Sequence, residues 1–159
     1  MKTNEAIDVV RNALDDLHIR YDYNAETRVI RTTIPIDCKI KHINFQIDFQ
    51  DAGINFFAIP SVSVDKKYFE EMRKYLSWAS LELAIGSFNM ISETSTIFFK
   101  YSLITLWSEN LPLEMIREII INACNSLYIF GDGMATIALG LSDAETEFAE
   151  AKAKKSNNS

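Results

Sequence analysis

The stretch that constrains the fold most is residues 78–106, because its hydrophobic pattern changes there from helical to alternating. Apolar side chains recur at helical spacing up to residue 85, whereas residues 97–103 have the pattern of a strand. Gly86 lies between the two patterns, and glycine commonly ends helices because it tolerates a left-handed backbone. We therefore predict a helix that ends at Gly86, followed by a β-hairpin.

The chain before this stretch predicts one helix and then a run of strands. Residues 4–18 repeat apolar side chains every three or four positions, with acidic residues between them, which indicates an amphipathic helix. Residues 42–49 alternate strictly between apolar and polar, which indicates a strand with one face in the core. The predicted strands are residues 20–24, 29–36, 42–49 and 54–59.

The part that follows the hairpin is dominated by one long apolar pattern. It begins at Pro112 and keeps its three-four spacing through Gly131 and Gly133 as far as Leu141, so we predict one continuous helix. Ser142 and a glutamate three residues later form a capping box that predicts a short terminal helix. The predicted organisation is one domain over residues 1–141, then that short helix and a disordered tail over residues 142–159, with the tail beginning at Lys152.

This order of elements predicts the fold class. One helix, three or four strands, a second helix, two strands and a third helix, all joined by short loops, are typical of an α+β protein. We expect an antiparallel sheet with the helices packed mainly on one face. The residues predicted to be buried are Phe45, Ile47, Leu76, Leu83, Phe99, Ile116, Ile120 and Leu127.

The charge and the start of the chain limit its partners and its location. A net charge of −6 over 159 residues argues against nucleic-acid binding, which needs a basic surface. The opening residues lack the apolar segment of a signal peptide, and no apolar run approaches the roughly 20 residues of a membrane span. We therefore expect a cytoplasmic protein that does not bind membranes, with reduced cysteines.

The residues able to perform chemistry do not form a recognisable motif. Cys38 and His42 are close in sequence, but a zinc site needs two further ligands, and only Cys124 and His18 remain of those types. Cys124 falls within the long apolar helix, which favours a buried and inert thiol over a nucleophile. We therefore predict that the chain is not an enzyme and has no catalytic residues, bound cofactor or metal.

One set of positions around Gly86 follows a known family pattern, namely Leu83, Gly86, Phe88, Ile97, Phe99 and Leu103, with residues 135–138 in the last helix. Over residues 64–141 the chain thereby resembles the YbjN-like family of bacterial proteins. The family pattern places an Asn in the turn after the helix, where this chain has Ser80. Members of this family are described as sensory transduction regulators, and their fold is similar to that of the dimeric chaperones of type III secretion. The resemblance implies this architecture and a homodimer.

The most specific functional hypothesis is therefore a non-enzymatic, chaperone-like regulatory protein that binds a protein or peptide. We also predict a homodimer, because the sequence has more apolar and aromatic residues than one small core requires. The alternatives are a small enzyme, which a pocket with convergent ionisable groups would favour, and a structural assembly protein, which predicts larger oligomers. The residues predicted to contact another subunit or partner are Phe98, Trp107, Ile119, Tyr128, Gly131 and Gly133.

Overall fold

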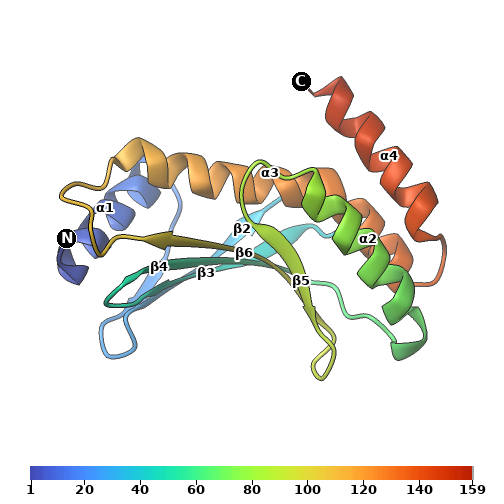
Figure 1. Cartoon of the computed structure of the whole chain (residues 1–159), viewed down its shortest axis with the longest axis horizontal. Helices are drawn as coiled ribbons and strands as arrows, with labels where there is room; N and C mark the ends of the chain where they lie inside the picture. The colour runs from blue at the N-terminus through green and yellow to red at the C-terminus, as the bar shows by residue number, and fades with distance from the viewer. Residues whose placement is uncertain (159) are drawn as a thin grey trace.

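Four α-helices and one sheet make up the described chain, residues 1–158 of a computed structural model. Figure 1 traces them from the N-terminus to the C-terminus. The helices are α1 (Thr3–Asp16), α2 (Phe69–Leu81), α3 (Leu113–Ala138) and α4 (Ala144–Asn157), with a 3₁₀ turn, η1 (Lys66–Tyr68), before α2. The strands are β1 (Asp22–Asn24), β2 (Val29–Pro35), β3 (His42–Phe49), β4 (Gly53–Pro60), β5 (Ser87–Ile91) and β6 (Thr96–Ile104).

The six strands form one antiparallel sheet in the order β1-β2-β3-β4-β6-β5. The final hairpin, β5–β6, adds to the sheet through β6, which pairs with β4. The register places one residue of each strand in a single row across the sheet. That row is Asp22, Arg31, Gln46, Phe57, Lys100 and Ser87.

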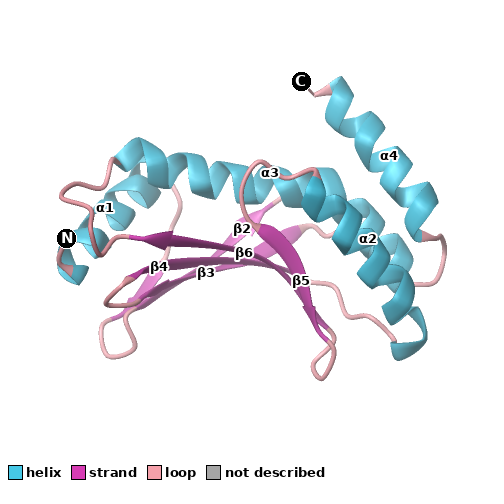
Figure 2. Ribbon diagram, viewed as in Figure 1, coloured by secondary structure: helices cyan, strands magenta, loops and turns pink. Residues whose placement is uncertain are grey.

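The helices gather on one side of this sheet (Figure 2). Helix α3 contacts β4, β6 and α1, while α2 contacts β5 and α4 contacts both α2 and α3. Apolar side chains of the strands alternate toward this helical layer, as in β3, where Ile43, Phe45 and Ile47 are buried. The predicted fold class, an α+β protein with an antiparallel sheet and helices on one face, is confirmed. None of the helices in residues 1–158 combines the length and hydropathy needed to cross a membrane.

The prediction that α2 ends at Gly86 is wrong, because the helix ends at Leu81. The hydroxyl of Ser80 accepts a hydrogen bond of 2.9 Å from the backbone N–H of Phe88, so the chain turns back early to begin β5. Gly86 is nevertheless required. Its φ is +72°, and a Cβ atom there would lie 2.5 Å from the ring of Phe99.

The early end of α2 also explains the one error in the predicted core. Leu83 lies in the turn after α2, half-buried against the core, and not on the buried stripe of the helix. The helical spacing that predicted its burial therefore does not apply there. The buried members of the predicted set are Phe45, Ile47, Leu76, Phe99, Ile116, Ile120 and Leu127.

Helix α3 is continuous through both glycines, as predicted. Each glycine allows a close contact with another part of the chain. A Cβ atom at Gly131 would lie 3.0 Å from Ile40 Cδ1, and one at Gly133 would lie 2.3 Å from the hydroxyl oxygen of Tyr75. The packing gained at these positions offsets the low helix propensity of glycine, which costs about 1 kcal/mol per residue.

Helix α4 begins one residue later and extends much further than predicted. Its N-cap is Asp143, whose carboxylate accepts a 2.8 Å hydrogen bond from the N–H of Thr146, and this bond lowers the pKa of Asp143. The predicted disorder from Lys152 onward is wrong for residues 152–157. Those residues remain helical because Lys155 donates to the carbonyl of Glu82 at 2.7 Å, and Lys152 Nζ lies 3.7 Å from a Glu82 carboxylate oxygen. The final residue of the predicted tail, Ser159, lies outside the described residues.

Candidate functional site

The fold leaves the side of the sheet away from the helices uncovered (Figure 2). Its side chains come from alternate positions of the central strands, so their pattern follows directly from the strand period. We call this surface the open face. It is defined by Arg31 and Thr33 of β2, Asn44 and Gln46 of β3, Phe57 and Ile59 of β4, and Phe98 and Lys100 of β6.

An aromatic pair lies at the centre of the open face. The rings of Phe57 and Phe98 come from neighbouring strands, with centroids 6.0 Å apart, and both residues are half-buried. The ammonium group of Lys100 lies 5.6 Å from the centre of the Phe57 ring. Ile59 follows two residues after Phe57 on the same face. These side chains form an apolar contact surface that consists of strand residues alone.

Polar side chains beside this pair are joined by hydrogen bonds. Arg31 Nε donates to the side-chain oxygen of Gln46 at 3.2 Å, and the amide of Gln46 donates to Asp48 at 2.8 Å. The hydroxyl of Thr33 donates to the amide oxygen of Asn44 at 3.2 Å. Because these hydrogen bonds fix the side chains relative to one another, the polar part of the open face is ordered without a ligand.

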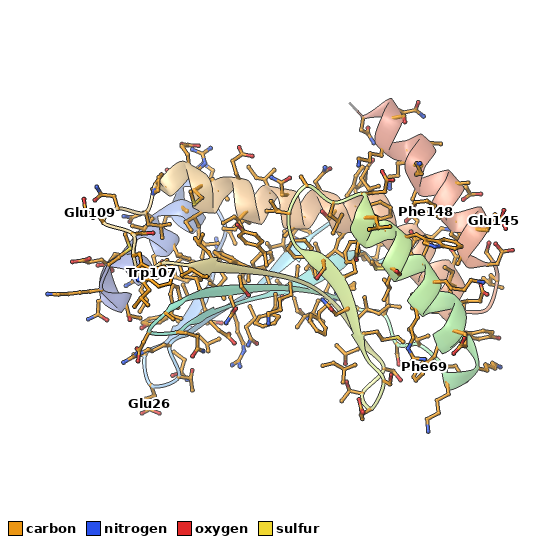
Figure 3. The ribbon with its side chains drawn as sticks, viewed as in Figure 1. Glu26, Phe69, Trp107, Glu109, Glu145 and Phe148 are labelled. Carbon is orange, nitrogen blue, oxygen red and sulfur yellow. The ribbon has the colours of Figure 1, made fainter. Side chains whose placement is uncertain are left out.

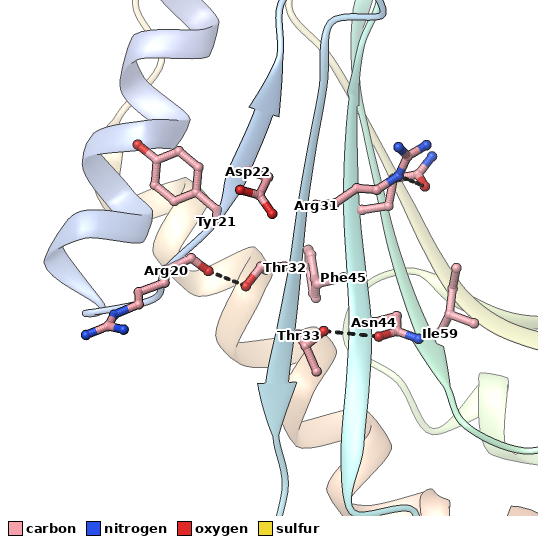
Figure 4. A pocket seen from close by; sticks show the side chains of 10 residues that line it. Arg20, Tyr21, Asp22, Arg31, Thr32, Thr33, Asn44, Phe45 and Ile59 are labelled. Carbon is pink, nitrogen blue, oxygen red and sulfur yellow. Dashed lines mark hydrogen bonds between the residues drawn. The ribbon is translucent and has the colours of Figure 1, made fainter.

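A hollow of about 520 Å³ lies where the open face meets the outer edge of β2 (Figure 4). We call it the edge hollow. It exists because β1 has only three residues, so the chain before Asp22 leaves β2 and turns toward α1. The hydroxyl of Thr32 donates to the carbonyl of Arg20 there, while the Arg20 guanidinium points outward. Its lining includes Arg20, Asp22, Arg31, Thr33, Asn44 and Ile59.

The backbone at the edge hollow has a free donor. Bonds from Phe49 N–H to Arg28 O and from Ile36 N–H to Lys41 O show that even-numbered residues of β2 bond to β3. Odd-numbered residues therefore direct their backbone groups toward β1, whose pairing stops at Arg31. Within residues 1–158, the N–H of Thr33 has no hydrogen-bond partner. Pro35, the next residue on this side, has no N–H at all.

The opposite edge of the sheet is closed by α2. Strand β5 pairs with β6 on one side, and on the other side it contacts α2. The hydroxyl of Ser80 occupies the N–H of Phe88, which would otherwise be available to an added strand. An incoming strand can therefore pair with the sheet at the β2 edge more readily than at the β5 edge.

The ionisable groups considered in the sequence do not assemble into a reactive set. Burial raises the pKa of Cys38, and it raises that of Cys124 to about 11, so both thiols are protonated and weakly nucleophilic. His42 Nε2 lies 2.8 Å from the hydroxyl of Ser61, but within residues 1–158 no carboxylate bonds to the other ring nitrogen. Among the described residues, no three or more histidine, cysteine, aspartate or glutamate side chains are arranged so that they could hold a metal ion.

The residues predicted to contact a partner are spread over different parts of the structure. Ile119, Gly131 and Gly133 are covered by the chain itself, because α3 is packed on several sides by other elements. Tyr128 is half-buried, with Lys154 Nζ 3.8 Å from its ring centre, and Phe98 belongs to the open face.

Trp107, in contrast, is 82% exposed (Figure 3). It forms one apolar surface segment with Ile104 and Leu106, which are 61% and 52% exposed. We call these three residues the Trp107 segment. Ile104 and Leu106 were not among the predicted contact residues, although their position just beyond the strand pattern of residues 97–103 was a usable signal.

The edge hollow was also missed by the sequence reasoning. The signal for it was the weak pattern of residues 20–24, which indicated a poor strand but not where its pairing with β2 would stop. The residue at which β1 stops pairing with β2 depends on the direction in which the chain leaves α1 and enters the sheet.

Comparison with known proteins gives a likeness of fold. No family model and no curated protein matches the chain. A solved structure described as "Crystal structure of YbjN, a putative transcription regulator from E. coli" matches with a TM-score of 0.53 and 14% identity. The match covers 84% of this chain and 88% of that one. At this identity the likeness concerns the fold alone. The resemblance that the residues around Gly86 indicated is thereby confirmed in the backbone, and this chain has the YbjN-like fold.

Proposed function

We propose that this protein is a non-enzymatic, chaperone-like regulatory protein that binds an extended segment of a partner protein on the open face. The observation that carries the proposal is the edge hollow, whose lining runs from the unpaired edge of β2 at Thr33 across β3 to Ile59 of β4. Ile59 is two residues from Phe57 on the same face, so the hollow leads toward the aromatic pair without including it. A segment that enters at this edge accepts a hydrogen bond from the Thr33 N–H and reaches the pair by crossing the open face over Ile59.

The open face suits a peptide better than a small molecule. Phe57 and Phe98 provide apolar contact, while Arg31 and Asn44 provide polar groups of fixed geometry around it. The two arginines of the edge hollow point in different directions (Figure 4), so they do not converge on one small ligand. An extended chain, in contrast, can cross from the β2 edge to the aromatic pair.

The enzyme alternative would require ionisable groups that converge on one pocket. The edge hollow contains Arg20, Arg31 and Asp22, but neither a histidine nor a cysteine. The regulatory role also agrees with the description of the YbjN structure, which calls that E. coli protein "a putative transcription regulator". We propose a bacterial, cytoplasmic location as well, supported by free thiols at Cys38 and Cys124.

The binding proposal is tested with peptides selected from a random library displayed on phage, and their contacts are then mapped by NMR. We expect the selected peptides to shift the amide signals of Thr33, Asn44 and Phe57. Phe57→Ser should weaken binding about tenfold or more, since an aromatic anchor at the centre of an interface contributes about 1.4 kcal/mol or more. Leu81→Ser serves as the control, because Leu81 is 84% exposed at the end of α2 and belongs neither to the open face nor to the Trp107 segment. Peptides that map elsewhere, or bind Phe57→Ser as tightly, would contradict the proposal.

We also propose that the protein is a homodimer. The Trp107 segment supports this proposal, because three large apolar side chains are exposed within four residues. Contiguous exposed apolar surface of this kind is typical of protein interfaces. A twofold contact would cover the segment on both subunits, since an isologous interface uses the same surface twice. This assignment leaves the open face free for a partner.

Light scattering coupled to size-exclusion chromatography tests the dimer. We expect a dimer mass at protein concentrations of about tens of micromolar. Trp107→Ser should shift the mass toward the monomer, because it removes the largest exposed apolar side chain of the segment. Leu81→Ser is the matched control, since Leu81 is 84% exposed but lies at the end of α2. A monomer mass for the unmodified protein at those concentrations would refute the dimer. Larger oligomers would instead favour the structural assembly alternative.

A further inference from the structure

A second hollow, of about 190 Å³, lies between α3 and α4 in the helical layer, away from the open face. We call it the acidic hollow. Helix α4 contributes residues spaced three and four apart, which places them on the helix face that packs toward α3. The lining comprises Ile129, Asp132 and Gly133 of α3 with Glu147, Glu150, Ala151 and Lys154 of α4.

Glu147 is the unusual residue of the acidic hollow. It is only 6% exposed, and within residues 1–158 its carboxylate has no hydrogen bond and no ion pair. Its oxygens are not sealed inside the protein. The one fully buried side-chain nitrogen or oxygen without a partner in the described chain is Nε of Arg117. The carboxylate of Glu147 therefore reaches accessible space, and the space it lines is the acidic hollow.

The only cation in the lining is already engaged. Lys154 Nζ donates to the carbonyl of Tyr128 at 2.6 Å, lies over that ring, and is 3.6 Å from a carboxylate oxygen of Asp132. Three carboxylates and one ammonium group thus line the acidic hollow, and Glu147 has no cationic partner among the described residues. A carboxylate on a residue that is mostly buried gains most from a positive group that enters the space beside it.

The volume of the acidic hollow and the separation of its carboxylates indicate which kind of cation fits. The described residues contain no group of three or more metal-ligating side chains close enough to hold a metal ion. The volume of 190 Å³ equals roughly six water molecules, which is larger than a single ion needs. A planar cation with several N–H donors can span carboxylates that are too far apart to meet at one point. Guanidinium has five such donors and is weakly hydrated, so it enters a partly buried site more readily than ammonium.

We propose that the acidic hollow binds the guanidinium group of an arginine side chain supplied by a partner protein. Glu147 accepts hydrogen bonds from the guanidinium, and Glu150 at the rim contributes a second negative charge. The apolar stem of the arginine lies against Ala151 and Gly133. Because this site is on the helical side of the sheet, the proposal does not rest on the function proposed for the open face.

The probe is arginine capped at both ends as N-acetyl-arginine N-methylamide, titrated into the full chain and followed by NMR. We expect saturable shifts of the amide signals of Gly133, Glu147 and Ala151 at concentrations up to roughly 10 mM, which saturates a site with a millimolar dissociation constant. The capped citrulline analogue has nearly the same shape without the charge, so it should not bind. The capped lysine analogue should bind more weakly than arginine.

Two variants on one helix separate a specific site from general attraction to an acidic protein. Glu147→Gln should weaken binding about tenfold or more, because it removes the charge that assists the hydrogen bonds. Glu145→Gln changes the net charge equally on an exposed part of α4 (Figure 3) and should leave binding unchanged. Circular dichroism checks that both variants fold. If Glu147→Gln does not fold, Glu150→Gln at the exposed rim takes its place, with a weaker binding constant expected.

Three results would overturn the proposal. They are the absence of saturable shifts, binding of citrulline as tight as that of arginine, and equal effects of the two glutamate variants. Agmatine, a free guanidinium compound, provides a further comparison. If agmatine binds more tightly than capped arginine, the natural ligand is a small molecule, which would overturn the assignment to a protein side chain.

Discussion

Replacing Phe130 with alanine is expected to lower the free energy of unfolding by roughly 3–5 kcal/mol, as large-to-small changes at buried aromatic positions do. Phe130 is 1% exposed, and its ring packs edge-on against both Tyr75 and Phe88 at centroid distances of 6.3 and 5.9 Å. The substitution would leave a cavity where α2, α3 and β5 meet. Chemical denaturation followed by circular dichroism measures the change.

Phe57→Ala provides the comparison for Phe130→Ala, because it removes the same side chain from the open face. Phe57 is half-buried and contacts only its neighbours on that face, so we expect a loss of about 1 kcal/mol. Equal losses for the two variants would mean that Phe130 does not lie in a closely packed core, and the arrangement of α2, α3 and β5 described above would be incorrect.

Replacing Gly133 with alanine is expected to cost roughly 1–3 kcal/mol, although alanine is the better helix former. The added Cβ would lie 2.3 Å from the hydroxyl oxygen and 2.4 Å from Cζ of Tyr75. Tyr75 cannot move aside easily, because it is fully buried and its hydroxyl donates a 2.7 Å hydrogen bond to the carbonyl of Phe130. Thermal and chemical unfolding of the variant test this expectation.

The matched variant is Gly131→Ala, two residues earlier in the same helix. Its Cβ would lie 3.0 Å from Ile40 Cδ1 and 3.2 Å from Cys38 Sγ, and both of these atoms are ends of side chains that can shift slightly. The gain in helix propensity, about 1 kcal/mol, then offsets the closer contact, so we expect a stability near that of the unmodified protein. A larger loss at Gly131 than at Gly133 would contradict the packing described for α3.

Regular hydrophobic patterns in the sequence determined the elements of the fold and their class. Strand β3 has the predicted bounds, because strict alternation over eight residues permits only one register of buried side chains. Helix α3 is continuous as predicted, because its apolar spacing passes through Gly131 and Gly133 without a change of phase. The residues around Gly86 likewise indicated the YbjN-like fold. The structure shows why a glycine is needed there, because a Cβ atom would collide with the ring of Phe99 in the hairpin.

The tertiary structure alone decided where elements end and which apolar residues remain exposed. Leu83 has the spacing of a buried helical residue, but the bond from Phe88 N–H to Ser80 ends the helix before it. The last turns of α4 look disordered in sequence, yet ion pairs with Glu82 hold them in a helix. Both outcomes depend on partners distant in sequence, which local periodicity does not contain. For the same reason, the edge hollow beside β1 and the unpaired carboxylate of Glu147 were visible only after the chain had folded.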